Sequence, residues 1–408
     1  MIPSATNAQK TDSIVPPVLV KDTRARYVRF TLRLVRLNQA ARLHQPLRFT
    51  VEIMYRTEPS FMLKVLFSSV MILAVSHGLA QGVFTPPAHS NTFTNPLLKT
   101  GPDPWVVYWK GFYYYSNSTG ANLTLRKTAD ITDLQHAETK AVWIPEPGHP
   151  WSKQLWAPEL HRWGNKWYIY FAADAGDNAS HRIYVVENNS DDPIDGVWTL
   201  KGQVKDSSDR WAIDATTFEL NGQHYLVWSG WKGATDGEQD LYIAHMSNPW
   251  TIDSPRTLIS APTYPWETHG DLPGRHVSVN EGPEALKHDG KLFIVFSASG
   301  CWTDFYTLGV LEADTRKNLL DAGSWTKFDH PFLSTDSEGH AFGPGHNGFF
   351  TSPDGKQNWI IYHANPGPNE GCGNLRSPRI QPFTRNPDGS PHFGKPVPLG
   401  EPLDKPAR

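Results

Sequence analysis

The sequence predicts an all-β protein, and more narrowly a five-bladed β-propeller, on three observations. First, the 408 residues include 16 Trp, 14 Tyr and 19 Phe beside 32 Gly and 34 Pro, which combines strand formers with turn formers. Second, a pair of aromatic-rich strands joined by a tight turn recurs five times from about residue 90 onward. Third, the copies are evenly spaced, as repeated blades require.

Each copy has an apolar strand, a turn containing Gly, Asn or Asp, and a second strand rich in Tyr, Trp and Phe. In chain order, the predicted hairpins are 105–116, 159–171, 216–228, 283–297 and 347–362. Asn-Gly and Asp-Gly turns are strong hairpin signals because their central residues adopt positive φ. The turns fall at positions 111, 165, 222, 290 and 355, a spacing of 54 to 68 residues. This spacing suits four-stranded blades, and 182–186 and 241–245 are candidate outer strands, whereas a two-sheet sandwich would not explain the even period.

The front of the chain differs from the repeat region. Residues 1–61 are rich in arginine and lack aromatic-rich strands. Residues 62–80 contain a short charged start, an apolar run over 65–75 and small residues at the exit, which is the layout of a secretory signal peptide. We therefore expect translation to begin at Met62, residues 1–61 to be a disordered or poorly packed gene-model extension, and 90–408 to be the propeller. An Arg-rich organelle leader or a signal anchor is the alternative.

A secreted destination agrees with other features of the sequence. Glycosylation sequons begin at Asn117, Asn122, Asn178 and Asn188. Cys301 and Cys372 are the only two cysteines, so one disulfide and two separate thiols are both open. The net charge of -3 provides no basic field, which argues against a nucleic-acid partner. We expect a monomer that does not bind membranes in its mature form.

Acidic residues recur at matching positions of the repeat. The first strand of each blade lies beside the central channel, so equivalent positions converge there. Counting back eight residues from the first four turns leads to Asp103, Ala157, Asp214 and Gly282, which directly follows Glu281. The equivalent region of the fifth copy is Gly345-His346. Each acid alone could be a turn or capping residue, but three carboxylates and a histidine brought together are hard to explain structurally, because like charges repel.

Converging acids in an aromatic-walled pocket suit glycoside hydrolysis, which needs one acid and one base. Asp103 lies between two prolines and is the candidate base, while Glu281 has the longer side chain and is the candidate acid. Asp214 is the candidate that holds the acid in place and keeps its pKa raised. Glu284 lies inside the following strand and is interpreted as a structural group.

These residues resemble glycoside hydrolase family 43, five-bladed propeller enzymes that act on arabinofuranosides and xylosides. The resemblance covers residues 90–408 and rests on one motif in each blade. The motifs are Gly101-Pro102-Asp103-Pro104-Trp105, Trp156-Ala157-Pro158-Glu159-Leu160, Ala212-Ile213-Asp214-Ala215, Asn280-Glu281-Gly282-Pro283 and Gly343-Pro344-Gly345-His346-Asn347. The family implies the same roles for the three acids, with inversion of configuration. It also implies that His346 binds a structural calcium or sodium ion at the propeller centre, largely through waters, although a hydrogen-bonded core histidine is the alternative. No cofactor is expected for the chemistry itself.

Other residues are candidates for binding the sugar. Trp105, Trp156 and Trp302 are candidate stacking walls, and Arg376 and Arg379 are candidates to reach the site from the fifth blade. Surface salt bridges are the alternative for both arginines. The insert 263–275 is a candidate rim of the pocket.

The segments 300–304 and 376–379 resemble the exo-acting arabinofuranosidase branch of the family. The resemblance therefore implies release of terminal α-L-arabinofuranose from arabinan or arabinoxylan. The alternatives are a β-xylosidase, an endo-arabinanase of the same fold, and a non-catalytic sugar-binding propeller, which would not need three acids.

Overall fold

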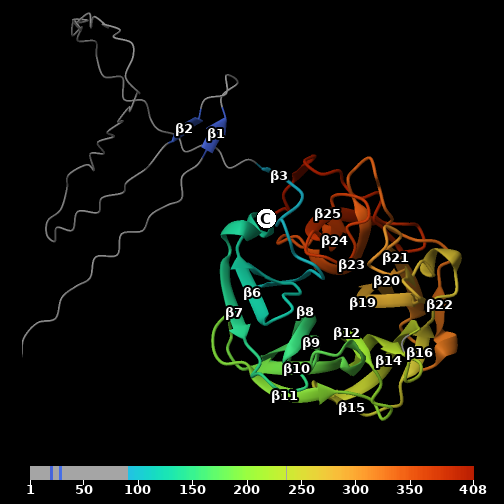
Figure 1. Cartoon of the computed structure of the whole chain (residues 1–408). Helices are drawn as coiled ribbons and strands as arrows, with labels where there is room; N and C mark the ends of the chain where they lie inside the picture. Colours follow the sequence, from blue (N-terminus) through green and yellow to red (C-terminus); the bar gives the residue numbers. More distant parts are fainter. Residues whose placement is uncertain (1–18, 22–26, 30–90, 236) are drawn as a thin grey trace, which may run out of the picture. The chain divides into compact units, whose positions relative to one another are not determined.

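The computed structural model describes residues 19–21, 27–29, 91–235 and 237–408 (Figure 1). Within the first 83 residues, it describes only the antiparallel pair β1 (Leu19–Lys21) and β2 (Tyr27–Arg29). The rest of the expected extension 1–61 and the whole expected signal peptide 62–80 lie outside the described residues. Among those that are described, no helix is long and apolar enough to cross a membrane.

The repeat folds into five antiparallel blades arranged around an axis, which confirms the predicted five-bladed propeller (Figure 1). A short parallel pairing of β14 with β19 joins blades three and four into one continuous sheet. Blade one contains β4 (Trp105–Trp109), β5 (Phe112–Ser116), β6 (Leu123–Thr128) and β7 (Glu138–Trp143). Blade two contains β8 (Lys153–Trp163), β9 (Lys166–Asp174), β10 (Arg182–Asn188) and β11 (Thr199–Val204). Blade three contains β12 (Ala212–Leu220), β13 (Gln223–Trp231), β14 (Glu238–Asn248), β15 (Thr251–Ile252) and β16 (Thr257–Ser260).

Blade four contains β19 (Ser278–His288), β20 (Lys291–Ala298), β21 (Thr307–Asp314) and β22 (Trp325–Lys327). Blade five contains β23 (Phe342–Thr351), β24 (Asn358–Asn365), β25 (Ser377–Arg385) and β26 (Pro391–His392). The inner strands β8, β12, β19 and β23 lie nearest the centre in Figure 1. The insert between blades three and four forms η3 (Pro265–Glu267) and the hairpin of β17 (Asp271–Leu272) and β18 (Arg275–His276). The remaining 3-10 turns are η1 (Ile131–His136), η2 (Asn178–Ser180) and η4 (Ala322–Ser324).

Apolar side chains fill the spaces between neighbouring blades. Separate buried clusters join blades one and two, two and three, three and four, four and five, and five and one. Trp167, for example, is almost fully buried between blades one and two, and Phe293 between blades four and five. Because every blade is packed on both sides, the ring closes without an exposed apolar sheet face.

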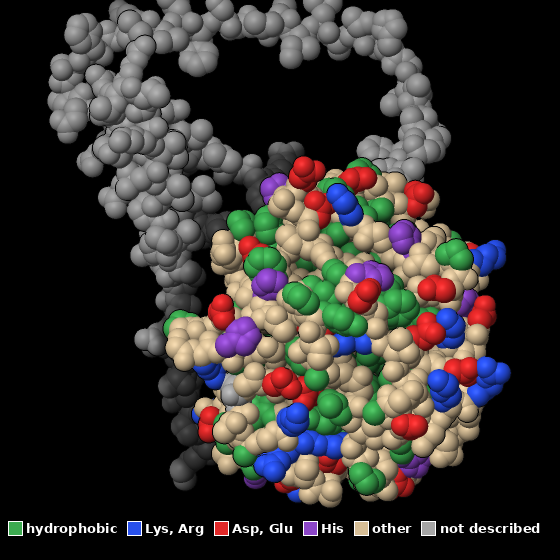
Figure 2. All heavy atoms as spheres, turned by 90° about the vertical axis from the view of Figure 1, so that its right-hand side faces the viewer, with side chains coloured by type: hydrophobic (Ala, Val, Ile, Leu, Met, Phe, Trp, Pro, Cys, Tyr) green, Lys and Arg blue, Asp and Glu red, His purple; other side chains and the backbone are tan. Residues whose placement is uncertain are grey.

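The two ends of the propeller chain meet at the junction of blades one and five. β3 (Thr92–Thr94) pairs antiparallel with β27 (Pro402–Asp404). The Asn95 side-chain amide then donates to the Ile380 carbonyl at 2.9 Å, and its oxygen accepts the Ile380 N–H at 3.0 Å. On the face shown in Figure 2, acidic and basic side chains are interspersed around the surface.

The predicted second strands agree closely with the structure, but four first strands begin earlier than expected. The strands β8, β12, β19 and β23 start four to six residues before the predicted hairpins at 159, 216, 283 and 347. In each case a bulge interrupts the strand just before the predicted start. A bulge breaks the two-residue alternation of side chains, so the pattern in the sequence is readable only after it.

The packing between blades predicts a large loss of stability when a buried aromatic side chain is removed. Phe293→Ala deletes a fully buried ring of β20 and should lower the free energy of unfolding by about 3–5 kcal/mol. The measurement is denaturant-induced unfolding followed by tryptophan fluorescence. Val197→Ala, at a side chain that is 80% exposed, is the control and should change stability by less than about 0.5 kcal/mol. Equal effects of the two substitutions would contradict the packing described here.

Candidate active site

A bulge recurs at the same place in the first strand of four blades. The pairing of the first strand with the second skips residues 157–158, 214–215, 282–283 and 346–347. In blade one the equivalent residues, Asp103 and Pro104, directly precede β4. The first residue of each pair has positive φ: Asp103 56°, Ala157 43°, Asp214 54°, Gly282 53° and His346 49°. These are the positions found by counting back from the turns.

Side chains of the preceding blade hold the backbone N–H groups of four bulges. Asp103 N donates to His363 Nδ1 of blade five at 3.1 Å, and Ala157 N donates to Ser118 Oγ of blade one at 2.7 Å. Gly282 N donates to Asp214 Oδ2 of blade three at 3.1 Å. The fourth bond runs from His346 N to Ser297 Oγ of blade four, at 2.7 Å. These four bulges are therefore fixed by the neighbouring blade as well as by their own sheet.

The bulges line one pocket of about 470 Å³ at the centre of the ring. They contribute Pro102, Asp103, Trp156, Ile213, Asp214, Glu281 and His346 to its walls. The structure thus brings the three acids singled out in the sequence, and His346, to a single cavity. A bulge re-aims side chains, which is why residues on different strands can point into one volume.

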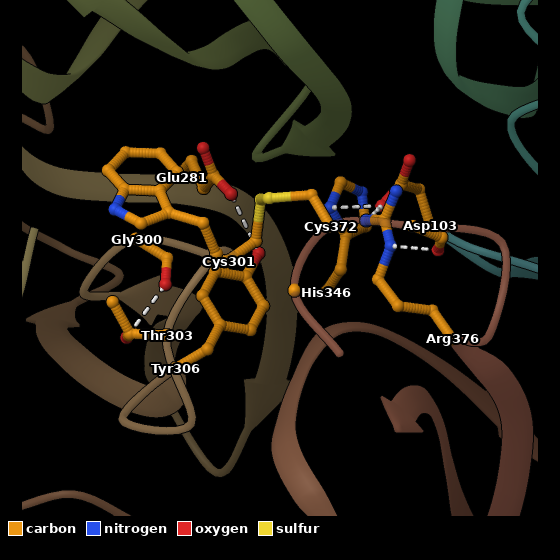
Figure 3. Close-up of a disulfide and its surroundings, with 12 residues drawn as sticks. Asp103, Glu281, Gly300, Cys301, Thr303, Tyr306, His346, Cys372 and Arg376 are labelled. Carbon is orange, nitrogen blue, oxygen red and sulfur yellow. Dashed lines mark hydrogen bonds and ion pairs between the residues drawn. A yellow bond between two sulfur atoms is a disulfide. The ribbon is translucent and has the colours of Figure 1, made fainter. Parts of the chain in front are cut away.

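The Asp103 carboxylate lies beside a guanidinium, two imidazole rings and a hydroxyl group (Figure 3). Its Oδ1 lies 2.7 Å from Arg376 Nη1, and 3.5 and 3.6 Å from the Nδ1 atoms of His346 and His363. Ser118 Oγ donates to Oδ2 at 2.5 Å. Burial alone would raise the pKa of Asp103, but the Arg376 guanidinium, the two histidines and the Ser118 hydroxyl outweigh it and lower the pKa. Asp103 is therefore an anion at neutral pH.

Glu281 has the opposite character. Its carboxyl is buried, and Tyr306 Oη donates to its Oε1 at 2.9 Å (Figure 3). Burial raises the pKa of Glu281 to about 7, with the negative charge of Asp103 adding to the rise and the Tyr306 hydroxyl opposing it. A carboxyl with such a pKa still carries its proton in much of the neutral range.

Asp214 lies beside Glu281 and is linked to it through the backbone, because its Oδ2 accepts the Gly282 N–H. Burial, followed by the neighbouring charges of Glu281 and Asp103, raises the pKa of Asp214 well above its ordinary value. Two buried carboxyls in this position do not both ionise easily, since each negative charge opposes the other. The pair therefore tends to keep a proton in the neutral range.

Two glycines permit the close packing beneath the carboxyls. A Cβ at Gly282 would meet the His346 ring at 3.1 Å, and Gly282 also has a φ of +53°. A Cβ at Gly345 would lie 2.3 Å from the Tyr306 ring. These positions require glycine if His346 and Tyr306 are to approach Asp103 and Glu281.

Loops around the mouth build the walls of the pocket. Trp156 lines the pocket and stacks on His181, with ring centroids 3.9 Å apart. Trp302 lines the same pocket. Cys301 and Cys372 form a disulfide that is also part of the lining, which settles the question that the sequence left open. Leu272 of the β17–β18 insert faces the same cavity, so the insert does form part of the rim.

Two of the proposed sugar-contacting residues do not reach the pocket. Trp105 is a core residue: its ring lies in the cluster between blades one and two, and its Nε1 donates to the Leu160 carbonyl at 3.0 Å. Arg379 is fully buried inside blade five, where its Nη2 donates to the His340 carbonyl at 2.8 Å. Both predictions were wrong because a side chain buried between blades, as in β4, or within a blade, as in β25, cannot also face the channel. Arg376, by contrast, lines the pocket and bonds to Asp103.

Several site residues were missed by the sequence reasoning. Tyr306 and Ser118 donate to the carboxyls of Glu281 and Asp103, and His363 accepts the backbone N–H of Asp103. All three belong to second strands or loops without a repeated motif. Trp211 and Gln239 also line the pocket, and Gln239 Oε1 is buried without a hydrogen-bond partner. An unsatisfied buried carbonyl oxygen facing a cavity is suited to accept a hydrogen bond from a bound hydroxyl group.

Few protein side chains at the centre of the propeller could bind a metal ion. Among the described residues, no group of three or more His, Cys, Asp or Glu side chains could hold a metal. His346 Nδ1 is directed toward Asp103, while both polar atoms of the buried Asn347 side chain lack a partner. Protein side chains alone therefore do not complete the coordination of an ion, and the ion expected at His346, bound largely through waters, stays a prediction. No step of the chemistry is derived through it.

Known proteins share this fold and sequence. The model of the family "Glycosyl hydrolases family 43" matches residues 93–391. The extracellular exo-alpha-(1->5)-L-arabinofuranosidase of Streptomyces avermitilis is 37% identical over 81% of this chain and 70% of its own length. Alpha-L-arabinofuranosidase B of Pyricularia oryzae is 34% identical over 82% of this chain and 70% of its own length.

A solved structure gives the same result. The crystal structure of an alpha-L-arabinofuranosidase from Lactobacillus brevis superposes with a TM-score of 0.70 at 34% identity. The match covers 76% of this chain and 98% of that protein. Because the family model spans most of the propeller and relatives above 30% identity cover about four fifths of the chain, this protein belongs to glycosyl hydrolase family 43.

Proposed function

We propose that this protein is a secreted α-L-arabinofuranosidase that releases terminal arabinofuranose from arabinan or arabinoxylan by inverting hydrolysis. The proposal rests mainly on one observation: of two carboxyls in the same pocket, one is held ionised and the other keeps its proton. Arg376 and its neighbours hold Asp103 as an anion, while burial keeps the proton on Glu281. Glycoside hydrolysis needs this division between a base and an acid.

In the proposed reaction, Asp103 takes a proton from a water molecule as the water oxygen bonds to the anomeric carbon of arabinose. The bond from that carbon to the glycosidic oxygen breaks, and Glu281 gives its proton to the leaving oxygen. The products are free arabinose and an alcohol, and proton exchange with solvent restores both carboxyls. Inversion requires carboxyls about 6.5–9.5 Å apart, which leaves room for the water. Asp214 keeps Glu281 oriented through Gly282.

The choice of arabinofuranose is supported by the relatives from Streptomyces avermitilis and Pyricularia oryzae, both of which are named as arabinofuranosidases. The pocket, with Trp156, Trp302 and the unpartnered Gln239 oxygen in its walls, offers apolar faces and a polar acceptor to one terminal sugar. The relative named as extracellular supports secretion of this chain. We expect it to act as a monomer on plant polysaccharides.

Removing the proton donor tests the proposed function. Glu281→Gln should lower kcat/KM for a 4-nitrophenyl α-L-arabinofuranoside and for arabinan by roughly 10²–10⁴-fold, because the leaving oxygen loses its acid. Glu284→Gln is a matched control three residues along β19. That buried carboxyl accepts from Thr216 at 3.3 Å and does not line the pocket, and burial raises its pKa, so the amide closely replaces the protonated acid.

Other outcomes of this assay point to other functions. Release of xylose alone from aryl glycosides would indicate a β-xylosidase. Shortening of arabinan without free arabinose would indicate an endo-arabinanase. Binding of sugars without any hydrolysis by the wild-type protein would indicate a non-catalytic propeller.

The stereochemical course tests the role of Asp103. If Asp103 activates water, the first sugar detected by proton NMR from an α-linked substrate is the β-anomer, formed before mutarotation. Appearance of the α-anomer first would mean a covalent intermediate and would exclude the role of Asp103 as a base.

The two pKa values predict the pH profile. Glu281 must be protonated, so kcat/KM should fall about tenfold per pH unit above its pKa of about 7. Asp103 must be ionised, and because its pKa is lowered, the acid limb should lie below the ordinary value of 3.8. In Glu281→Gln the alkaline limb should disappear. An alkaline limb that is the same in both proteins would assign it to another group.

A further inference from the structure

The disulfide joins two loops at the mouth of the pocket (Figure 3). Residues 299–306 connect β20 to β21 in blade four and contain Cys301. Residues 366–376 connect β24 to β25 in blade five and contain Cys372. The bond therefore ties together neighbouring blades at the end where the carboxyls lie.

The last residue of each loop contacts one of the two opposed carboxyls. Tyr306, directly before β21, donates from its hydroxyl to Glu281 Oε1 at 2.9 Å. Arg376, directly before β25, donates from Nη1 to Asp103 Oδ1 at 2.7 Å. Tyr306 and Arg376 occupy equivalent positions, each preceding the third strand of its blade. One loop thus serves the proposed acid and the other serves the proposed base.

Short stretches of chain separate each cysteine from these contacts. Local hydrogen bonds stiffen both stretches: Thr303 N donates to the Gly300 carbonyl at 2.9 Å, and Arg376 N donates to the Gly373 carbonyl at 3.4 Å. A second link crosses between the loops, because Asn369 N lies 2.9 and 3.0 Å from the two Asp304 carboxylate oxygens. Movement of one loop would therefore be passed to the other.

The blades themselves do not depend on the disulfide. β20 pairs with β21 over eight residue positions and β24 pairs with β25 over seven. A buried cluster that includes Phe293 and Tyr362 holds blades four and five together. Loss of the covalent bond should consequently free the loops while the sheets remain folded.

We propose that the Cys301–Cys372 disulfide positions Glu281 and Asp103 for the proposed hydrolysis by locking together the loops that end in Tyr306 and Arg376. The inference rests on the proposed function of the same pocket. Loosening the loops would weaken both contacts at once, and the misplacement would act on the chemical step. The effect should accordingly appear in kcat more than in KM, since misplacement of reacting groups by about 1 Å can slow a reaction by 10²-fold.

The test compares the oxidised wild type with Cys301→Ser, Cys372→Ser and the double variant on the aryl arabinofuranoside. All three variants lack the same bond, so each should show a similar fall in kcat, roughly tenfold or more, with a smaller change in KM. Reduction of the folded wild type by dithiothreitol should give the same fall. This reaction forms two thiols and oxidises the reagent to its cyclic disulfide, and both cysteines are partly exposed to it. The double variant treated with dithiothreitol is the matched control and should not change.

A second readout separates positioning from simple stabilisation. Asp103 is faced by Arg376, His346, His363 and the Ser118 hydroxyl, with Glu281 and Asp214 across the pocket. When the Arg376 contact weakens, the acid limb of the pH profile should move toward neutral pH, whereas a merely structural bond would lower Tm and leave kcat and the profile unchanged. That second pattern would overturn the inference. An oxidised wild type with no glycosidase activity would instead overturn the proposed function, which distinguishes the two failures.

Discussion

The site depends on hydrogen bonds that the backbone N–H groups of the bulges donate to side chains of the preceding blade. A residue other than glycine with positive φ is strained by about 1–3 kcal/mol and persists only where its surroundings hold it. Asp103, Asp214 and His346 all adopt this conformation. The N–H groups of Asp103 and His346 are held by His363 and Ser297, which reach them from the neighbouring blade. The direction of these side chains is thus a property of the closed ring and not of any single sheet.

The same arrangement separates the pKa values of the carboxyls. Asp103 belongs to blade one, as does Ser118, but the other groups that lower its pKa, Arg376, His346 and His363, come from blade five. The base therefore exists only if the first and last blades meet, which links the chemistry to the pairing of β3 with β27 and to the contact of Asn95 with Ile380. Glu281 accepts a hydrogen bond from the neutral Tyr306 hydroxyl, but burial dominates and its pKa rises.

The sequence was sufficient to predict the propeller and the positions that converge on its axis. Both predictions used the repeat, because hairpin turns are readable from local chemistry and the distance from turn to bulge is the same in the first four copies. It did not reveal Tyr306, His363 or Ser118, whose roles depend on contacts between blades. For the same reason Trp105 and Arg379 were misplaced: their residue types suit a sugar site, but Trp105 packs between blades one and two and Arg379 is buried within blade five.

The bulge also explains why Glu281 does not occupy the same position in its blade as Asp103 and Asp214 do in theirs. Asp and His tolerate the left-handed conformation better than most residues, and they occupy the bulge in blades one, three and five. In blade four a Cβ at 282 would lie 3.1 Å from the His346 ring on a backbone with a φ of +53°, so this position favours glycine, which carries no carboxyl. The acid is instead supplied by Glu281, the residue before it in β19. The longer glutamate side chain reaches the pocket from there. The preference for glycine at position 282 thus explains why the proton donor is the neighbouring residue, Glu281.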